Sequence, residues 1–324
     1  MIVLGYLFFA ALTVGATVKA AHYINRLDHQ TKLSGAFLGG LVFASVTSLP
    51  ELISSLSATF ILNQPALAFG NIFGSNVFNM ALLAGVDLIF VKQFFFNHVH
   101  SQKKLNAMVF LMYLAFIVPL GYYLMTGSMM MALPFSVTSL FIVVLYALSV
   151  KDVLSLPSEP SEDKVTGPIQ ATLLKFSLSA VGVVMASLGL TYFTNEIALT
   201  YNLNTTFAGA IFLGAATSLP ELTALISLFK LKAYDIALGN IVGSSIFNFM
   251  IIALVDLLAF RDNLYLQVLE ETALRENLAT LLLFGGLNTI MIHVALSRRK
   301  TTKLALYILP SSIILMLYVL YLFV

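Results

Sequence analysis

The stretch TSLPEL, residues Thr47–Leu52, places a proline and a carboxylate inside an apolar run of the chain. The same six letters recur at Thr217–Leu222, again within an apolar run. A proline removes one helical hydrogen bond, and an ionised carboxylate is costly in apolar surroundings. Because the chain makes both costly choices twice, the two copies indicate a shared role rather than chance.

The composition around these copies is that of a membrane protein. Of the 324 residues, 59% are hydrophobic and only 10% are charged, and the mean hydropathy is +0.95. The apolar segments repeatedly reach the roughly 20 residues that a helix needs to cross a bilayer. No segment shows the alternation of a transmembrane β-strand. We therefore predict an all-α polytopic membrane protein.

Long apolar runs between polar segments predict ten transmembrane helices. Their approximate ranges are 2–24, 34–61, 66–90, 105–125, 129–150, 170–192, 204–230, 233–260, 276–296 and 304–323. The first run lacks a basic leading segment and is as long as the later ones, so we interpret it as a helix rather than a signal peptide. Ten crossings place both termini on the same side.

The basic residues are distributed unevenly between the two sides. Of the 17 Lys and Arg residues, only Arg261 and Arg275 fall on the side of the termini. The others are Lys19, Arg26, Lys32, Lys92, Lys103, Lys104, Lys151, Lys164, Lys175, Lys230, Lys232, Arg298, Arg299, Lys300 and Lys303. Cytoplasmic loops of membrane proteins carry an excess of Lys and Arg. Both termini are therefore predicted to lie on the outer side of the cell membrane.

The polar segment 151–168 is predicted to be a cytoplasmic linker between two halves. Residues 1–150 form the first five-helix half, and residues 169–324 form the second. An odd number of spans per half makes the second half enter the membrane from the opposite side. If the halves share a fold, they form an inverted repeat, which is a common plan of secondary transporters.

Self-comparison of the sequence supports such a repeat. GNIFGSNVFN, Gly70–Asn79, matches GNIVGSSIFN, Gly239–Asn248, at seven of ten positions with an offset of 169. TSLPEL matches its copy without a substitution. The repeated motifs occupy residues 40–90 and 209–260, so each one is predicted to be a hairpin of two neighbouring spans. The glycines of the motif should allow close helix packing.

Each motif carries a glutamate near the middle of the membrane. Glu51 and Glu221 lie about 17 residues into their predicted spans. No Lys or Arg lies at a comparable depth, so the predicted counter-charge is a bound cation or a proton. Pro50 and Pro220 break the same two helices, and broken helices at matched positions of inverted halves indicate an ion site in a transporter.

Oxygen-bearing side chains occupy the same positions in both motifs. They are Thr47, Ser48, Ser75, Asn79, Thr217, Ser218, Ser244 and Asn248. In each motif the Thr-Ser pair lies one helical turn before the glutamate, and the Ser and Asn of the next span are one turn apart. A set with oxygen but no sulfur or imidazole suits hard cations of the Ca²⁺ and Na⁺ type.

TSLPE followed by GNIxGSxxFN, twice and inverted, resembles the sodium/calcium exchangers of the cation/calcium exchanger superfamily, in the form of a prokaryotic-type membrane domain. The ten-span topology with both termini outside matches as well. The resemblance implies an antiporter that exchanges Ca²⁺ for Na⁺ by alternating access. It also implies that spans 2–24 and 170–192 slide as a gate. The lipid bilayer is the expected partner besides the ions. The resemblance implies no cofactor, no nucleic acid and no obligatory protein partner.

The resemblance also implies roles for the motif residues. Glu51 and Glu221 would bridge the Ca²⁺ and Na⁺ sites, and the Thr, Ser and Asn side chains named above would contribute further oxygens. The backbone carbonyls seven residues before each glutamate would come from Ala44 and Gly214. Two departures bear on ion selectivity: Val46 and Ala216 stand where the family usually has glycine, and some members carry Asp in place of Asn248.

Alternatives remain open from the sequence, and a passive channel is one of them, although broken helices from inverted halves favour alternating access. A proton-coupled exchanger of Ca²⁺, or of another divalent ion such as Mn²⁺, could use the same glutamates, since a carboxylate can bind a proton when no cation is present. An intramembrane aspartyl protease could use Asp87 and Asp256. The span directions place these two toward opposite faces of the membrane, so we expect no enzyme. We interpret both as interfacial pairs with the bases five residues later.

Overall fold

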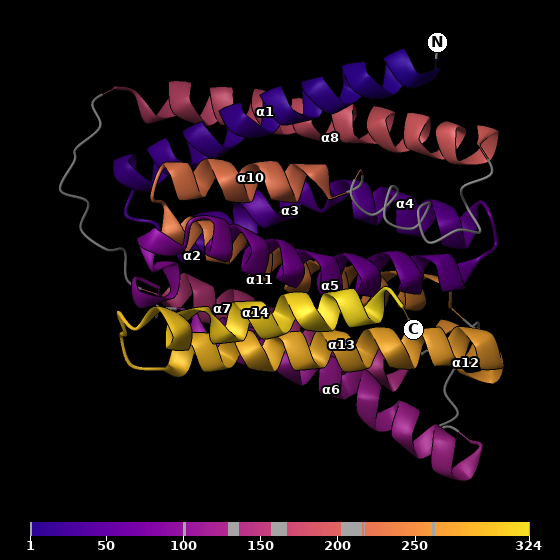
Figure 1. The fold of residues 1–324 in the computed structure, drawn as a ribbon. Coiled ribbons are helices and arrows are strands. Elements are labelled where there is room, and N and C mark those ends of the chain that lie inside the picture. The colour runs from indigo at the N-terminus through magenta and orange to yellow at the C-terminus, as the bar shows by residue number, and fades with distance from the viewer. Residues whose placement is uncertain are drawn as a thin grey trace. The chain divides into compact units, whose positions relative to one another are not determined.

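The computed structural model describes residues 2–99, 102–128, 136–156, 167–201, 216, 218–260 and 263–323. Two residues of the predicted ion site, Thr217 and Gly214, and the middle of the predicted linker lie outside these ranges. Within them the regular elements are all helices, and no strand is present. The prediction of an all-α polytopic membrane protein is confirmed (Figure 1).

The helical elements follow one another along the chain in the order drawn in Figure 1. The first half contains α1 (Ile2–Gln30), α2 (Gly35–Phe37), η1 (Leu38–Phe43), α3 (Ala44–Thr47), α4 (Leu49–Phe60), α5 (Pro65–Ile89), η2 (Val91–Gln93), η3 (Phe95–Asn97), α6 (Lys103–Thr126) and α7 (Val137–Ser155). The second contains α8 (Ile169–Thr200), α10 (Leu219–Lys230), α11 (Tyr234–Leu258), α12 (Leu264–Glu270), α13 (Thr272–Ser297) and α14 (Leu304–Tyr321).

The observed helices match nine of the ten predicted spans. Eight single helices of the described chain are long and apolar enough to cross a membrane, and the bent pair 35–47 and 49–60 brings the number to nine. The predicted span 204–230 contains α10, while most of its first part lies outside the described residues. The fifth predicted span begins at 129, whereas α7 begins at Val137 after a stretch that is not described. The number ten stays a prediction.

The TSLPEL stretch breaks its helix where the proline predicts. α3 ends at Thr47, Ser48 has φ −96° and ψ 5°, and α4 begins at Leu49. The two parts are bent by 43°. Pro50 lies in the first turn of α4, where its missing N–H has no helical partner to lose. The proline therefore starts a new helix rather than distorting an existing one.

The second TSLPEL copy has the same local form where it is described. Ser218 has φ −92° and ψ 14°, and α10 begins directly after it at Leu219. α4 and α10 each contain 12 residues. The helices that carry the glycine-rich motifs, α5 and α11, each contain 25 residues. Equal letters in the two copies therefore produce equal local structure.

The chain divides into two compact units that each combine parts of both predicted halves. Unit 1 contains residues 1–50 and 153–243, and unit 2 contains residues 51–152 and 244–324. In unit 1, α8 and α10 pack against α1 (Figure 1). In unit 2, α13 packs against α5, α6 and α14. These units do not coincide with the two halves predicted on either side of the linker 151–168. The division of the chain into those halves stays a prediction.

Helices α1 and α8 of unit 1 run antiparallel in a single register (Figure 1). Four contacts lie on it, and their residue numbers always add to 198: Gly5 with Phe193, Phe9 with Gly189, Ala16 with Gly182, and Tyr23 with Lys175. The rings of Phe9 and Phe193 stack with centroids 5.6 Å apart, and each ring lies where a Cβ of the facing glycine would be. The rings therefore interlock the two helices.

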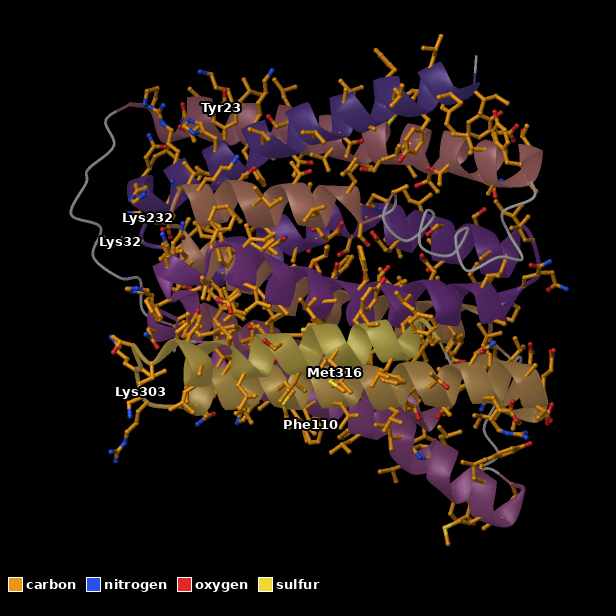
Figure 2. The ribbon with its side chains drawn as sticks, viewed as in Figure 1. Tyr23, Lys32, Phe110, Lys232, Lys303 and Met316 are labelled. Carbon is orange, nitrogen blue, oxygen red and sulfur yellow. The ribbon has the colours of Figure 1, made fainter. Side chains whose placement is uncertain are left out.

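Exposed apolar side chains cover the outer faces of the helices in both units. In unit 1, Leu4 and Phe8 on α1 are 70% and 62% exposed. In unit 2, Met316 on α14 is 63% exposed (Figure 2). Such surfaces are unfavourable in water and are expected where a helix contacts lipid.

Basic residues lie together at one end of unit 1. Figure 2 shows Lys32 and Lys232 at the same end as Tyr23. Lys175 lies over the ring of Tyr23, with its Nζ 6.0 Å from the centroid. These lysines come from distant parts of the chain, and the charge distribution predicts that they share a membrane face.

Candidate functional site

The first motif places its threonine in a fixed hydrogen-bond arrangement within unit 1. Thr47 is buried, and its Oγ1 donates to the Ala44 carbonyl at 3.2 Å and accepts from Asn240 Nδ2 at 3.3 Å. The Ala44 carbonyl also accepts the Ser48 N–H at 3.0 Å. Both predicted ligands therefore have protein partners. Ala44 would need the Thr47 hydroxyl to turn away before its carbonyl offered a free lone pair.

Ser48, which occupies the break itself, differs from its neighbour. Its side chain is 1% exposed, and its Oγ has no hydrogen-bond partner among the described residues. The non-helical backbone angles remove Ser48 from the pattern in which a helical serine bonds the carbonyl one turn back. A buried hydroxyl without a partner costs about 1–3 kcal/mol. Of Ala44, Thr47 and Ser48, the three predicted ligands of this motif in unit 1, Ser48 is thus the one whose ligand oxygen has no protein partner among the described residues.

Glu51 lies in the first turn of α4 and belongs to unit 2. Its side chain is 3% exposed, and within the described chain its Oε2 has no hydrogen-bond partner. A carboxylate buried in this way at membrane depth needs a partner of opposite charge or a proton. The role of Glu51 as a cation ligand stays a prediction.

The second motif buries the equivalent residues within unit 1. Ser218 is 2% exposed and Glu221 is 1% exposed. Glu221 lies in the first turn of α10, as Glu51 does in α4. Both glutamates therefore lie three residues after a serine with non-helical backbone angles, in the first turn of a helix. A helix start also favours negative charge, because its free N–H groups carry partial positive charge.

The Ser and Asn residues of the glycine-rich motifs lie buried on α5 and α11 in unit 2. Ser75 and Asn79 are 7% and 2% exposed, and Ser244 and Asn248 are 0% and 1% exposed. The Oδ1 atoms of Asn79 and Asn248 have no hydrogen-bond partner in the part of the chain that is described. Two buried amide oxygens are thus without a protein partner there, and their role as cation ligands stays a prediction.

The glycines of the second motif allow the predicted close packing inside unit 1. A Cβ at Gly243 would overlap the Gly40 carbonyl, and one at Gly239 would lie 2.9 Å from the Gly40 nitrogen. Here α11 touches the backbone of η1, a π-helical segment, and such segments are often found at functional sites. For Gly70 and Gly74, a Cβ would meet no described atom within 4 Å. Their packing role stays a prediction.

Three asparagines that sequence reasoning did not single out organise these groups. Asn240 binds the Thr47 hydroxyl, and Asn71 donates to the Ser54 hydroxyl at 3.0 Å. Asn76 accepts a hydrogen bond from Asn248 at 2.9 Å. The signal for the first two was present in the sequence, because GN opens the glycine-rich motif in both copies. A partner on another helix, however, is not encoded by spacing.

Both carboxylates are buried in unit 2, so the expectation that Asp87 and Asp256 lie at the membrane interface is wrong, while the pairing of Asp256 with Arg261 stays a prediction. Asp87 accepts hydrogen bonds from the hydroxyls of Tyr307 and Ser311, the second at 2.7 Å. Arg298 lies close enough to Asp87 to interact electrostatically, and burial lowers the pKa of this guanidinium. Arg261, the predicted partner of Asp256, lies outside the described residues.

Asp256 is held by three donors. Its Oδ2 accepts from the Ser136 N–H at 2.9 Å and from the Ser139 hydroxyl at 2.7 Å, and its Oδ1 accepts from the Leu264 N–H at 3.0 Å. The bonds attach α11 to the starts of α7 and α12. Both aspartates are therefore structural links between helices.

Among the described residues, no three acidic, histidine or cysteine side chains come together as a metal cluster. Each unit instead combines a buried glutamate with neutral hydroxyl or amide oxygens. Sparse charge with many neutral oxygens is suited to ions that bind and leave, since a site that is too strong would retain its ion.

Comparisons with known proteins place this geometry in a family. The family model described as sodium/calcium exchanger protein matches residues 1–150 and 172–324. The uncharacterized membrane protein MJ0091 of Methanocaldococcus jannaschii is 26% identical over 68% of this chain and 70% of its own length. The inner membrane protein YrbG of Escherichia coli is 28% identical over 66% of each chain.

Solved structures of the sodium-calcium exchanger NCX_Mj share the fold. The form soaked with 2.5 mM Na⁺ and 0.1 mM Sr²⁺ has a TM-score of 0.70 at 20% identity, covering 99% of this chain and 98% of that one. The form soaked with 100 mM Na⁺ and 10 mM Sr²⁺ has a TM-score of 0.72 at 18% identity, with the same coverage. The family model spans nearly the whole chain. The chain therefore belongs to the sodium/calcium exchanger protein family and is a multi-pass membrane cation/Ca²⁺ exchanger, not an enzyme.

Proposed function

We propose that the chain exchanges Na⁺ for Ca²⁺ across the cell membrane by alternating access. The observation that carries the proposal is the broken helix at Ser48, which is followed by the buried carboxylate of Glu51 with its Oε2 unpartnered among the described residues. A carboxylate at this depth is stable when a cation or proton binds it. Breaks at matched places in the two halves are typical of transporter ion sites.

The proposed cation ligands are the carboxylates of Glu51 and Glu221 with the neutral oxygens of the motifs. The neutral ligands are Ala44, Thr47, Ser48, Ser75, Asn79, Gly214, Thr217, Ser218, Ser244 and Asn248. Two carboxylates balance the charge of one Ca²⁺, and hydroxyl, amide and carbonyl oxygens suit both Ca²⁺ and Na⁺. The transported ions are substrates.

The proposed architecture is ten spans in two inverted five-helix repeats, residues 1–150 and 169–324, with both termini outside and residues 151–168 in the cytoplasm. It is supported by the equal lengths of α4 and α10 and of α5 and α11. The gathering of lysines at one end of unit 1 supports the placement of the basic loops (Figure 2).

Transport by the purified protein in sealed vesicles tests the proposal. Vesicles loaded with Na⁺ are diluted into Na⁺-free medium with radioactive Ca²⁺, and parallel vesicles carry a pH gradient instead. We expect rapid Ca²⁺ uptake with the Na⁺ gradient and none above leak with the pH gradient. Uptake driven by the pH gradient alone would replace Na⁺ by H⁺ as the coupling ion.

Two neutral substitutions test the ligand assignment. Glu51→Gln and Glu221→Gln keep the shape of the side chain but remove its charge. A bond to a charged group is worth about 1.5–3 kcal/mol, so we expect a rise of at least about tenfold in half-saturating Ca²⁺, or loss of exchange. Glu276→Gln, at an exposed position on α13, is the matched control. Normal exchange by either motif variant would contradict the assignment.

A further inference from the structure

The two glycine-rich motifs differ in only one polar letter. Asn76 in GNIFGSNVFN corresponds to Ser245 in GNIVGSSIFN at the offset of 169, while the other two differences exchange apolar residues. The site residues on either side, Ser75 and Asn79 in the first copy, are identical in the second. Position 76 is therefore the one polar difference between the two motif copies, and it lies next to proposed ligands in the sequence.

Asn76 uses its extra amide to hold a ligand of the other copy. Its Oδ1 accepts a hydrogen bond from Asn248 Nδ2 at 2.9 Å, which joins α5 to α11 inside unit 2. Asn76 is 0% exposed and Asn248 is 1% exposed, so water does not compete freely for this bond. The Asn248 amide has only one other polar atom, Oδ1, and this atom has no partner among the described residues.

This bond decides which end of the Asn248 amide is available. An amide presents an acceptor oxygen and a donor nitrogen, and only the oxygen can bind a cation. With Nδ2 held by Asn76, Oδ1 remains for an ion. With Asn76 in its present orientation, turning the Asn248 amide over would bring the two amide oxygens together and put Nδ2 in place of the ligand oxygen. Such an orientation loses a buried hydrogen bond as well.

A buried tyrosine lies beside the Asn76 amide, whose Nδ2 has no hydrogen-bond partner among the described residues. The hydroxyl of Tyr113 lies beside this amide, and the Tyr113 side chain is fully buried. Its ring packs edge to face on Phe249, with centroids 4.9 Å apart. On the far side, a Cβ at Gly285 would overlap the Tyr113 hydroxyl, so the glycine of α13 provides the space for it. The aromatic packing thus fixes the position of the Tyr113 hydroxyl beside the Asn76 amide.

We infer that Asn76 is a positioning residue of the ion site, which orients the Asn248 amide so that its Oδ1 serves as a cation ligand. The inference rests on the proposed function, because it assumes that Asn248 binds a transported ion. Asn76 itself touches no ion in this scheme and acts through Asn248. Its effect should therefore disappear when position 248 has no amide.

A double-mutant cycle on the purified protein in vesicles tests this dependence. Half-saturating Ca²⁺ is measured for wild type, Asn76→Leu, Asn248→Ala and the double variant. We expect Asn76→Leu to raise half-saturating Ca²⁺ about tenfold, and the same change to add less than about twofold in the Asn248→Ala background. Asn76→Asp keeps an acceptor for Asn248 Nδ2 and should stay closer to wild type than Asn76→Leu.

Asn106→Leu is the matched control for the loss of a buried amide. Asn106 is also 0% exposed in unit 2, and its Nδ2 donates to the Thr289 carbonyl at 3.0 Å rather than to a proposed ligand. We expect it to lower the thermal unfolding temperature without changing half-saturating Ca²⁺. If Asn76→Leu does not fold, Asn76→Ser, which installs the residue of the second copy, replaces it in the cycle.

The outcomes separate this inference from the proposed function. Wild-type vesicles that show no Na⁺-driven Ca²⁺ uptake would overturn the proposed function. Wild-type vesicles that exchange normally while Asn76→Leu leaves half-saturating Ca²⁺ unchanged would overturn only the role of Asn76. The role of Asn76 would also be overturned if the double variant raised half-saturating Ca²⁺ by the product of the two single effects. A positioning residue must act through Asn248, so its effect cannot be independent of position 248.

Discussion

At the scale of single residues, two neighbours in one motif illustrate how tertiary contacts separate similar side chains. Thr47 and Ser48 both carry a hydroxyl at the end of α3. The Thr47 hydroxyl is bonded to Ala44 and Asn240, whereas the Ser48 hydroxyl has no partner in the described chain. A ligand can bind Ser48 without breaking a protein hydrogen bond, so Ser48 should contribute more to ion affinity.

We predict that Ser48→Ala raises half-saturating Ca²⁺ by about 5- to 10-fold, since a hydrogen-bonding oxygen contributes about 1 kcal/mol. Ca²⁺-dependent exchange in vesicles measures the effect. The control is Ser149→Ala on α7, where a buried serine donates to its own helix at Leu145 at 2.8 Å. Equal affinities for wild type and Ser48→Ala would show that this hydroxyl meets no ion.

A second prediction concerns the three hydrogen bonds that Asp256 accepts. In Asp256→Asn, one acceptor oxygen becomes a donor that faces the N–H or hydroxyl groups now bound. We expect a loss of about 1–3 kcal/mol in the free energy of unfolding, because at least one buried donor loses its acceptor. Thermal unfolding in detergent measures it, with exposed Glu276→Gln as control. Unchanged stability would remove Asp256 from the links that hold α11.

At the scale of elements, the interlocked rings of Phe9 and Phe193 distinguish two glycines of α1. A Cβ at Gly5 would overlap the Phe193 ring, whereas one at Gly15 would meet no described atom within 4 Å. We predict that Gly5→Ala destabilises the protein by about 1–3 kcal/mol through overpacking, and that Gly15→Ala does not. Thermal unfolding of both variants tests the contrast. Equal stabilities would refute the interlock.

The register of α1 and α8 also permits a covalent test. The chain contains no cysteine, and a Cβ on Gly182 would lie 3.4 Å from the Cβ of Ala16. Cβ atoms joined by a disulfide are about 3.5–4.5 Å apart. We predict that Ala16→Cys with Gly182→Cys forms a disulfide under mild oxidation, and that Gly15→Cys with Gly182→Cys does not. Linkage detected by mass spectrometry in the second pair would contradict this register.

The same disulfide tests whether α1 and α8 slide past each other during ion exchange. If α1 and α8 keep their register through the cycle, the oxidised protein should retain Na⁺-driven Ca²⁺ uptake within about twofold of the reduced protein. A loss of uptake that a reducing agent restores would instead require the two helices to change register.

At the scale of the whole molecule, the charge distribution predicts the orientation in the membrane. Because the chain has no cysteine, single cysteines can report which side is accessible. We predict that Ser128→Cys, beyond the end of α6, reacts with an impermeant maleimide in intact cells. Ser155→Cys, at the end of α7, should react only after permeabilisation. Both positions are exposed. The reverse labelling pattern would invert the topology.

Much of the fold could be predicted because its signals are local. Hydropathy identified nine spans that the structure contains, and Pro50 marked the break between Thr47 and Leu49. The fates of Asp87 and Asp256 could not be predicted, because Tyr307 lies 220 residues from Asp87 and Ser136 lies 120 residues from Asp256. Nearby bases in the sequence suggested ion pairs, whereas hydroxyl and backbone N–H groups from other segments of the chain donate the observed hydrogen bonds.

By itself, the sequence determined the class of the protein, the nine spans that the described structure contains, and the two motifs in which proline and glutamate occur within an apolar run. These features follow from composition and spacing, because a helix satisfies its own backbone hydrogen bonds in lipid and an unpartnered charge there is energetically costly. Only the tertiary structure decided which oxygens of the motif are already bonded and which remain open. TSLPEL predicts Thr47 and Ser48 as equivalent ligands, but Asn240, brought from a distant segment, bonds only Thr47. Such pairing depends on distances between helices, and a linear pattern carries no information about them.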